Sequence, residues 1–141
     1  MLQVWNGKNF ERTSLKSIGL RVQLGHLPGA RCLNPQPVHG DFTVIHTNGM
    51  HSVAVDYCRC DLSFHEGYKQ QQLLRGEWYP ATHIDPQTAF TFRVLEHFHM
   101  QTLQGKVASY DYYTALEKLT NNTGIRPCKV GYAVVQKIPV C

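Results

Sequence analysis

Apolar and polar residues alternate most clearly between positions 42 and 57, and this pattern predicts a β-hairpin. Two alternating runs, 42–47 and 50–57, flank Asn48-Gly49, a dipeptide typical of two-residue turns because both residues tolerate positive φ angles. One face of the hairpin would be apolar and buried. The residues on that face would be Phe42, Val44, Val53, Val55 and Tyr57.

The segment before the hairpin is predicted to contain one strand and one loop. Every second residue from Ile18 to Leu24 is apolar, which indicates a strand over residues 18–24. Residues 25–41 are rich in glycine and proline, which indicates a loop, and Cys32 lies in its middle. Residues 61–84 are mixed in character, and residues 70–74 and Trp78-Tyr79 fit either a strand or an irregular connection, which Pro80 interrupts.

The clearest helical signal begins with Asp85 and Pro86, which resemble an N-cap and the first residue of a helix. The apolar residues that recur at helical spacing after them are Phe90, Val94 and Phe98. The pattern therefore predicts a helix over residues 86–104.

A second helix is predicted over residues 109–120, with Ser109 as its cap and a stop near Asn121. Its buried side would carry Tyr112, Tyr113, Leu116 and Leu119. Residues 129–140 fit either a late edge strand or a loose tail. Together these elements predict an α+β fold, in which a small sheet containing the hairpin is joined to a C-terminal pair of helices.

Composition narrows the class of protein. The chain has 141 residues, of which 43% are hydrophobic, enough for one domain with a modest core. No apolar run approaches the roughly 20 residues that span a bilayer. The first residues also lack the basic-then-apolar layout of a signal peptide. We therefore expect an intracellular protein without membrane contact.

The net charge of +4 permits contact with nucleic acid but does not require it. Four basic residues are spread through the first part of the chain rather than clustered, namely Lys8, Arg12, Lys16 and Arg21. They form either a solvated face or a weak, salt-sensitive contact to the DNA backbone. Binding to DNA would place the protein in the nucleus.

Five cysteines and eight histidines indicate a candidate metal site. An odd number of cysteines without a signal peptide argues against a disulfide framework. Cys58-Arg59-Cys60 is the sharpest feature, because residues two apart in an extended chain point the same way. Zinc takes about four ligands, and Cys32 and His26 in the upstream loop are the best partners for the pair.

His51 is a third candidate partner, but it meets a geometric objection. Seven positions separate it from Cys58, so in an unbroken strand the two side chains face opposite ways unless a bulge intervenes. With the predicted turn, His46 would face His51, and the two rings would either hold a metal or pack beside the turn. For the whole set, the alternative is a metal-free structural or interaction domain whose cysteines are buried in the core.

The remaining candidates carry little chemistry. His97 and His99 are two apart on a predicted helix and cannot share a face, and Cys128 and Cys141 have no matching partner. No motif supplies a base for a cysteine nucleophile, the acidic residues are scattered, and no glycine-rich phosphate loop follows a strand. We therefore expect neither an enzyme nor a small-molecule substrate.

Several short stretches between residues 4 and 126 form an ordered pattern that is more specific than the C-x-C spacing alone. They are Trp5-Asn6-Gly7, Thr13-Ser14-Leu15, Leu24-Gly25-His26, Pro28-Gly29, Cys32, Asn48-Gly49-Met50-His51, Tyr57-Cys58-Arg59-Cys60, Gln72-Leu73-Leu74-Arg75, Trp78-Tyr79-Pro80-Ala81-Thr82, Thr91-Phe92-Arg93-Val94-Leu95-Glu96-His97-Phe98-His99 and Leu119-Thr120-Asn121-Asn122-Thr123-Gly124. This pattern resembles the CxC-like cysteine cluster domain associated with KDZ transposases, which is known mainly from fungal genomes.

The resemblance implies a non-catalytic, zinc-chelating module that precedes a transposase catalytic domain and binds DNA or that domain. The positions that match its cysteine and histidine pattern are His26, Cys32, His51, Cys58 and Cys60. The domain would cover residues 1–126, with a divergent tail over 127–141. Because the acidic residues of a transposase are absent and the family's sequence normally extends further on both sides, we expect a truncated relic of such a protein.

Overall fold

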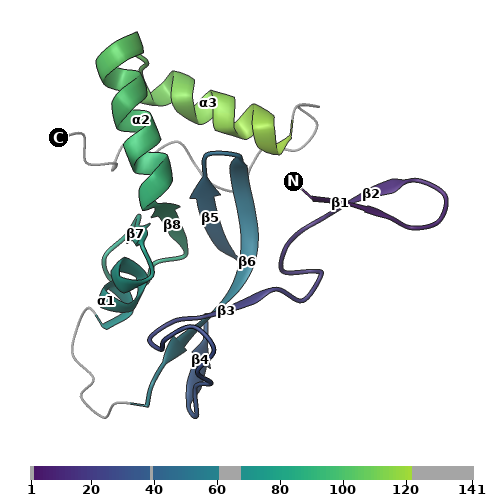
Figure 1. Ribbon diagram of the computed structural model, residues 1–141, viewed down its shortest axis with the longest axis vertical. Coiled ribbons are helices and arrows are strands. Elements are labelled where there is room, and N and C mark those ends of the chain that lie inside the picture. The colour runs from purple at the N-terminus through teal and green to yellow at the C-terminus, as the bar shows by residue number, and fades with distance from the viewer. Residues whose placement is uncertain (1, 39, 61–67, 122–141) are drawn as a thin grey trace.

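The computed structural model describes residues 2–38, 40–60 and 68–121 of the chain (Figure 1). Its main sheet has six strands, with β3, β6, β5, β8 and β7 in spatial order and β4 paired to β6. The strands of this sheet are β3 (Arg21–Gln23), β4 (Pro35–Pro37), β5 (Phe42–His46), β6 (Gly49–Cys58), β7 (Trp78–Pro80) and β8 (Thr88–Thr91). The helices are α1 (Tyr68–Arg75), α2 (Phe92–Gly105) and α3 (Ser109–Thr120). The fold is α+β, as the sequence predicts.

The predicted hairpin is confirmed as β5 and β6, but its turn lies one residue earlier than predicted. Thr47 and Asn48 form the turn, and His46 pairs with Gly49. His51 therefore pairs with Val44, and the two histidines do not face each other. Gly49 is needed for a reason other than the turn. Its φ is 126°, and a Cβ at this position would lie 2.7 Å from the hydroxyl of Thr120, so its lack of a side chain allows α3 to come close.

Helices cover both faces of the main sheet. The apolar face predicted for the hairpin packs with Leu73 of α1 and with Ala89 of β8. The opposite face, through Ile45 and Met50, packs with α2 and α3. Ile45 is apolar although most residues on this hairpin face are polar. The reason is that the helices cover this end of the face, and Ile45 is buried beneath them.

The first C-terminal helix begins later than predicted. Residues 88–91 form β8, which pairs parallel with β5 and antiparallel with β7, so their backbone groups are used by the sheet. Helix α2 begins only at Phe92, and the hydroxyl of Thr91 accepts the Val94 N–H at 3.3 Å as its cap. The Asp85-Pro86 start signal was therefore wrong, because long-range strand pairing outweighs a local preference.

The second helix is confirmed as α3, although two of its details differ from prediction. Ala108, and not Ser109, is the N-cap, and it makes no side-chain capping bond. Leu119 is exposed, whereas Tyr112, Tyr113 and Leu116 are buried as predicted. The predicted strand over 18–24 shortens to β3, which pairs parallel with β6. Residues 129–140 lie outside the described residues.

Helix α1, the N-terminal strand pair and β4 are elements that the sequence pattern did not predict, and β4 lies inside the predicted 25–41 loop. Helix α1 covers residues 70–74, for which a strand or an irregular connection was wrong, whereas β7 confirms a strand at Trp78-Tyr79. Near the N-terminus, β1 (Leu2–Trp5) and β2 (Phe10–Thr13) form a separate two-stranded antiparallel sheet, seen apart from the main sheet in Figure 1. Within the described ranges, no helix has both the length and the apolar character needed to cross a membrane.

One buried hydroxyl joins the hairpin to the end of α3. Thr120 Oγ1 accepts the backbone N–H of Met50 at 2.7 Å and donates to the Leu116 carbonyl at 2.8 Å. Replacing Thr120 by Val is expected to lower the free energy of unfolding by about 1–3 kcal/mol, because the Met50 N–H loses its partner in the core. Chemical denaturation would measure this loss. Thr120→Ser keeps the hydroxyl and is the control, so an equal loss in both variants would contradict the role of the hydrogen bond.

Candidate metal centre

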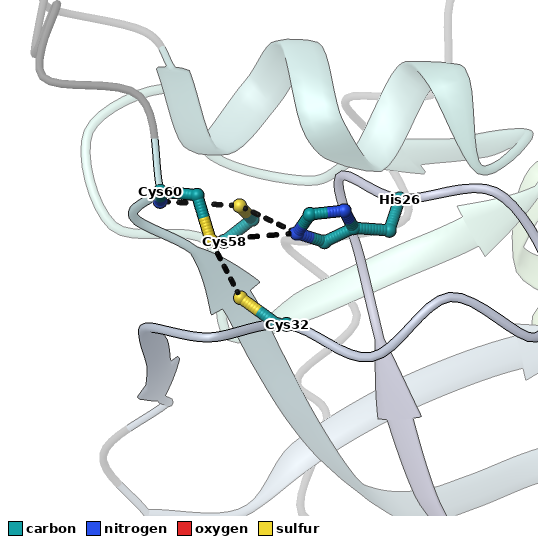
Figure 2. Close-up of side chains that lie close together, drawn as sticks. All are labelled: His26, Cys32, Cys58 and Cys60. Carbon is teal, nitrogen blue, oxygen red and sulfur yellow. Dashed lines mark hydrogen bonds between the residues drawn. The ribbon is translucent and has the colours of Figure 1, made fainter.

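Four sulfur and nitrogen ligand atoms converge at the end of β6. The side chains of His26, Cys32, Cys58 and Cys60 point toward one another, and their ligand atoms all lie within 4.8 Å (Figure 2). The histidine Nε2 lies 3.1 Å from Cys58 Sγ and 3.6 Å from Cys60 Sγ. The Sγ atoms of Cys32 and Cys60 are 3.5 Å apart, and all three cysteines are free thiols. The convergence that the sequence predicts is therefore present.

Helix α1 holds the first cysteine of the C-x-C motif. Gln72 brackets the backbone of Cys58, accepting its N–H at 2.8 Å and donating to its carbonyl at 2.9 Å. The N–H of Cys60 in turn lies 3.3 Å from Cys58 Sγ, which is a favourable arrangement for a thiolate. This segment also pairs with the start of β4, where Arg59 N–H donates to the Asn34 carbonyl at 3.0 Å.

The loop that carries the other two ligands is closed by a second glutamine. Gln23, at the end of β3, donates to the Ala30 carbonyl and accepts the Cys32 N–H, both at 2.9 Å. One side chain therefore spans the loop and fixes Cys32. This loop forms the first part of the predicted 25–41 loop and is irregular, as predicted. The second part of the predicted loop contains β4.

Gly25 permits the closest approach between the two halves of the site. Its φ is +83°, and a Cβ built on it would lie 2.6 Å from the Cβ of Cys58. Real Cβ atoms do not come this close, so the position admits only glycine without a shift of the backbone. Because His26 is the next residue, the same approach brings its ring to the cluster.

The thiols of the cluster do not share one electrostatic state. Partial burial raises the pKa of Cys58 to about 11. Hydrogen bonding from Cys32, and then from His26, lowers the pKa of the exposed Cys60 to about 6. A thiolate, which is the form of cysteine that binds metals, therefore forms more easily in this cluster than on an isolated cysteine.

His51 does not belong to this group, and its inclusion among the candidate ligands was wrong. It lies near the turn, where its Nε2 is 2.8 Å from Asn48 Oδ1. Burial lowers the pKa of its ring. The objection from the strand period was correct, because β6 runs unbroken from the turn to Cys58.

The histidines considered above as weaker metal candidates include two with structural contacts. His46 Nδ1 lies 2.8 Å from the Thr91 hydroxyl that caps α2. His97 Nδ1 lies 2.7 Å from the Tyr112 hydroxyl and so joins α2 to α3. Cys128 and Cys141 lie outside the described residues.

The four basic residues near the N-terminus differ in their surroundings. Lys16 forms an ion pair with Asp41 at 2.9 Å, and Arg21 forms one with Asp56 at 2.6 Å. Arg12 donates to the Asn121 side chain at 2.7 Å, and Lys8 lies in the turn between β1 and β2. Contact of these four residues with DNA stays a prediction. Lys8 and Arg12 are the better candidates, because the charges of Lys16 and Arg21 are already paired with carboxylates.

The residues that position the ligands escaped sequence reasoning. Gly25, next to a candidate ligand, carried a usable signal, because a glycine beside a metal ligand often marks a close approach of the backbone. Gln23 had none. Gln72 lies in one of the stretches that carry the family resemblance, but that stretch gave no sign of its contact with Cys58, because the contacts of both glutamines depend on tertiary structure.

The fold and the cluster together define a cysteine-histidine cluster domain, in which a three-cysteine, one-histidine group ties a loop to the end of a central strand. Comparison with protein families matches residues 15–124 to the family described as CxC2 like cysteine cluster associated with KDZ transposases. The chain belongs to this family, as the sequence resemblance indicates. Searches of curated proteins and of solved structures found no match.

Proposed function

We propose that His26, Cys32, Cys58 and Cys60 hold one zinc ion. The observation that carries this proposal is their spacing. Four ligands around a tetrahedral zinc, with sulfur at about 2.3 Å and nitrogen at about 2.0 Å, would lie about 3.5–3.8 Å from one another. Three of the separations among these ligand atoms are 3.1, 3.5 and 3.6 Å, near that range, and all of them are within 4.8 Å. Thiolate and imidazole ligands also favour zinc over magnesium or calcium, which prefer oxygen.

The alternative, a metal-free domain with cysteines in its core, accounts for the cluster less well. Of the three cysteines in the cluster, only Cys32 is buried, whereas Cys58 is partly exposed and Cys60 is exposed. Burial of apolar thiols would not place an imidazole among three sulfurs at a solvent-exposed edge. A shared cation gives these four groups a reason to converge there.

A zinc ion held by four protein side chains has a structural role. Catalytic zinc sites keep one coordination position open for water or substrate, and a three-cysteine, one-histidine set fills all four. We therefore infer a non-catalytic module that serves a KDZ-type transposase through contact with DNA or with the catalytic domain. The family's association with transposases supports this role.

The test of the zinc site is the metal content of the purified chain. Elemental analysis is expected to find one zinc per chain, and Cys58→Ser or Cys60→Ser is expected to reduce it to near zero because a three-ligand site binds far more weakly. Cys141→Ser and His51→Ala are matched controls and should keep the full content. A wild-type chain without zinc, or a Cys58→Ser chain that retains it, would refute the proposal.

A further inference from the structure

The β1–β2 hairpin is a surface element outside the matched family domain, which begins at residue 15. It stands apart from the main sheet in Figure 1, and all residues of its strands except Thr13 are exposed. Among the described elements, only isolated contacts such as that of Arg12 with Asn121 connect it to the rest of the domain. The hairpin therefore presents a surface and contributes little to the core.

Strand pairing gives this hairpin two unlike faces. Trp5 pairs with Phe10, and their ring centroids are 5.1 Å apart. Gln3 pairs with Arg12 beside them. Directly opposed residues share a face, so one face carries two aromatic rings, an amide and a guanidinium group. The rings are accessible, since Trp5 is 55% exposed and Phe10 is 65% exposed.

The charge on the aromatic face is positive and unbalanced. The acidic residue of the hairpin, Glu11, pairs with Val4 on the other face and accepts a hydrogen bond from Asn6. Lys8 lies in the turn that joins the two strands, and no described carboxylate is within ion-pair distance of its ammonium group. A polyanion would therefore meet cationic side chains at the edge of the two rings.

We propose that this face binds single-stranded nucleic acid, with bases stacked on Trp5 and Phe10 and phosphates contacted by Lys8 and Arg12. Aromatic rings beside cationic side chains are the arrangement by which proteins bind single strands without sequence preference. Bases within a duplex are already stacked on one another and leave no free π-face for these rings. The inference rests on the nucleic-acid role proposed above and is independent of the zinc site.

A second copy of the chain is a poorer occupant of this face. A standard protein interface uses about 20–30 residues from each partner. The hairpin, residues 2–13, is shorter than that, and pairing two identical hairpins would bring their cationic residues together. A stable dimer through this face alone is therefore not expected.

The experiment is a fluorescence titration of the full zinc-loaded chain with single strands of about 15 nucleotides. Oligothymidylate, oligouridylate and a duplex DNA of equal length are the three probes. Both single strands are expected to quench the tryptophan emission, and the duplex is expected to bind more weakly and quench less. Trp5→Leu is expected to remove the quenching, which identifies its source as Trp5 rather than Trp78, and to weaken binding about tenfold or more.

Three further variants separate stacking from loss of the hairpin. Because the Trp5 variants lack the reporting indole, the affinity of every variant is measured by the fluorescence anisotropy of a labelled oligonucleotide. Trp5→Phe keeps an aromatic ring and should bind within a few fold of the wild type, whereas Phe10→Leu should weaken binding. Val4→Ala, on the other face, should bind as the wild type does. Equal binding by Trp5→Leu, or equal quenching by duplex and single strand, would overturn the inference while leaving the DNA role intact. Self-association that Trp5→Leu abolishes, without quenching by any probe, would overturn it in favour of a second copy. Zinc content, measured on the same samples, reports separately on the metal site.

Discussion

Removal of zinc is expected to lower the free energy of unfolding of the domain by about 4 kcal/mol, the value that linkage gives when free zinc exceeds its dissociation constant about 1,000-fold. The metal is proposed to join the loop after β3 to the end of β6, and the unfolded chain offers no preformed site. Urea denaturation with and without a chelator would measure the effect as a midpoint lowered by about 2 M, given the usual dependence on urea.

None of the four candidate ligands belongs to the apolar clusters on the two faces of the sheet. The zinc-free chain should therefore remain folded at urea concentrations below its lowered midpoint. The loss is expected to be local, with faster amide exchange at Cys32 and Arg59, whose N–H groups bond within the site. The Cys58→Ser variant should have the low midpoint at the outset and show no response to chelator. A wild-type midpoint that the chelator leaves unchanged would contradict a stabilising metal.

Replacing Gly25 by Ala is expected to reduce zinc affinity by about 10- to 100-fold, the range found for residues that orient metal ligands. The new Cβ would lie 2.6 Å from the Cβ of Cys58, and the φ of +83° is unfavourable for alanine. The loop must then move away from the end of β6, which carries His26 away from the sulfurs. Competition with a chelating dye would measure the change.

Gly29→Ala is the matched control, because it lies in the same loop with a φ of +89° but has no atom within 4 Å of a built Cβ. It incurs the backbone strain of a left-handed alanine, about 1–2 kcal/mol, without the clash. Its zinc affinity should therefore stay near that of the wild type. If both variants lose affinity equally, backbone strain and not the approach to Cys58 explains the effect.

Local patterns in the sequence were sufficient for the hairpin and for α3, because each is specified by residues close together in the chain. They were insufficient for the start of α2 and for the turn of the hairpin. Residues 88–91 join the sheet through pairing with β5, and Gly49 is used where Thr120 comes close. Both outcomes depend on segments far away in the sequence, which a local pattern does not contain.

The candidate site was predictable in its chemistry and only partly in its geometry. The C-x-C spacing, and the expectation that the cysteines form no disulfides, pointed to a group of three sulfurs. These three sulfurs lie together. The choice between His26 and His51 could not be made from residue type, since both are histidines near candidate sulfurs. It depends on the strand period, which turns His51 away from Cys58, and on the close approach that Gly25 permits.

The parallel pairing of β3 with β6 and of β5 with β8 has a kinetic consequence. These pairs join residues about 35 and 45 positions apart, respectively, as the contacts of Arg21 with Asp56 and of His46 with Thr91 illustrate. Closing such loops costs entropy before any contact compensates for it. We therefore expect the β5–β6 hairpin to form early in folding and its parallel neighbours to join late. His26 directly follows the late β3, and so the four ligands come together only near the end of folding. A cation that binds them acts on the rate at which the domain opens and leaves the rate at which it first assembles almost unchanged.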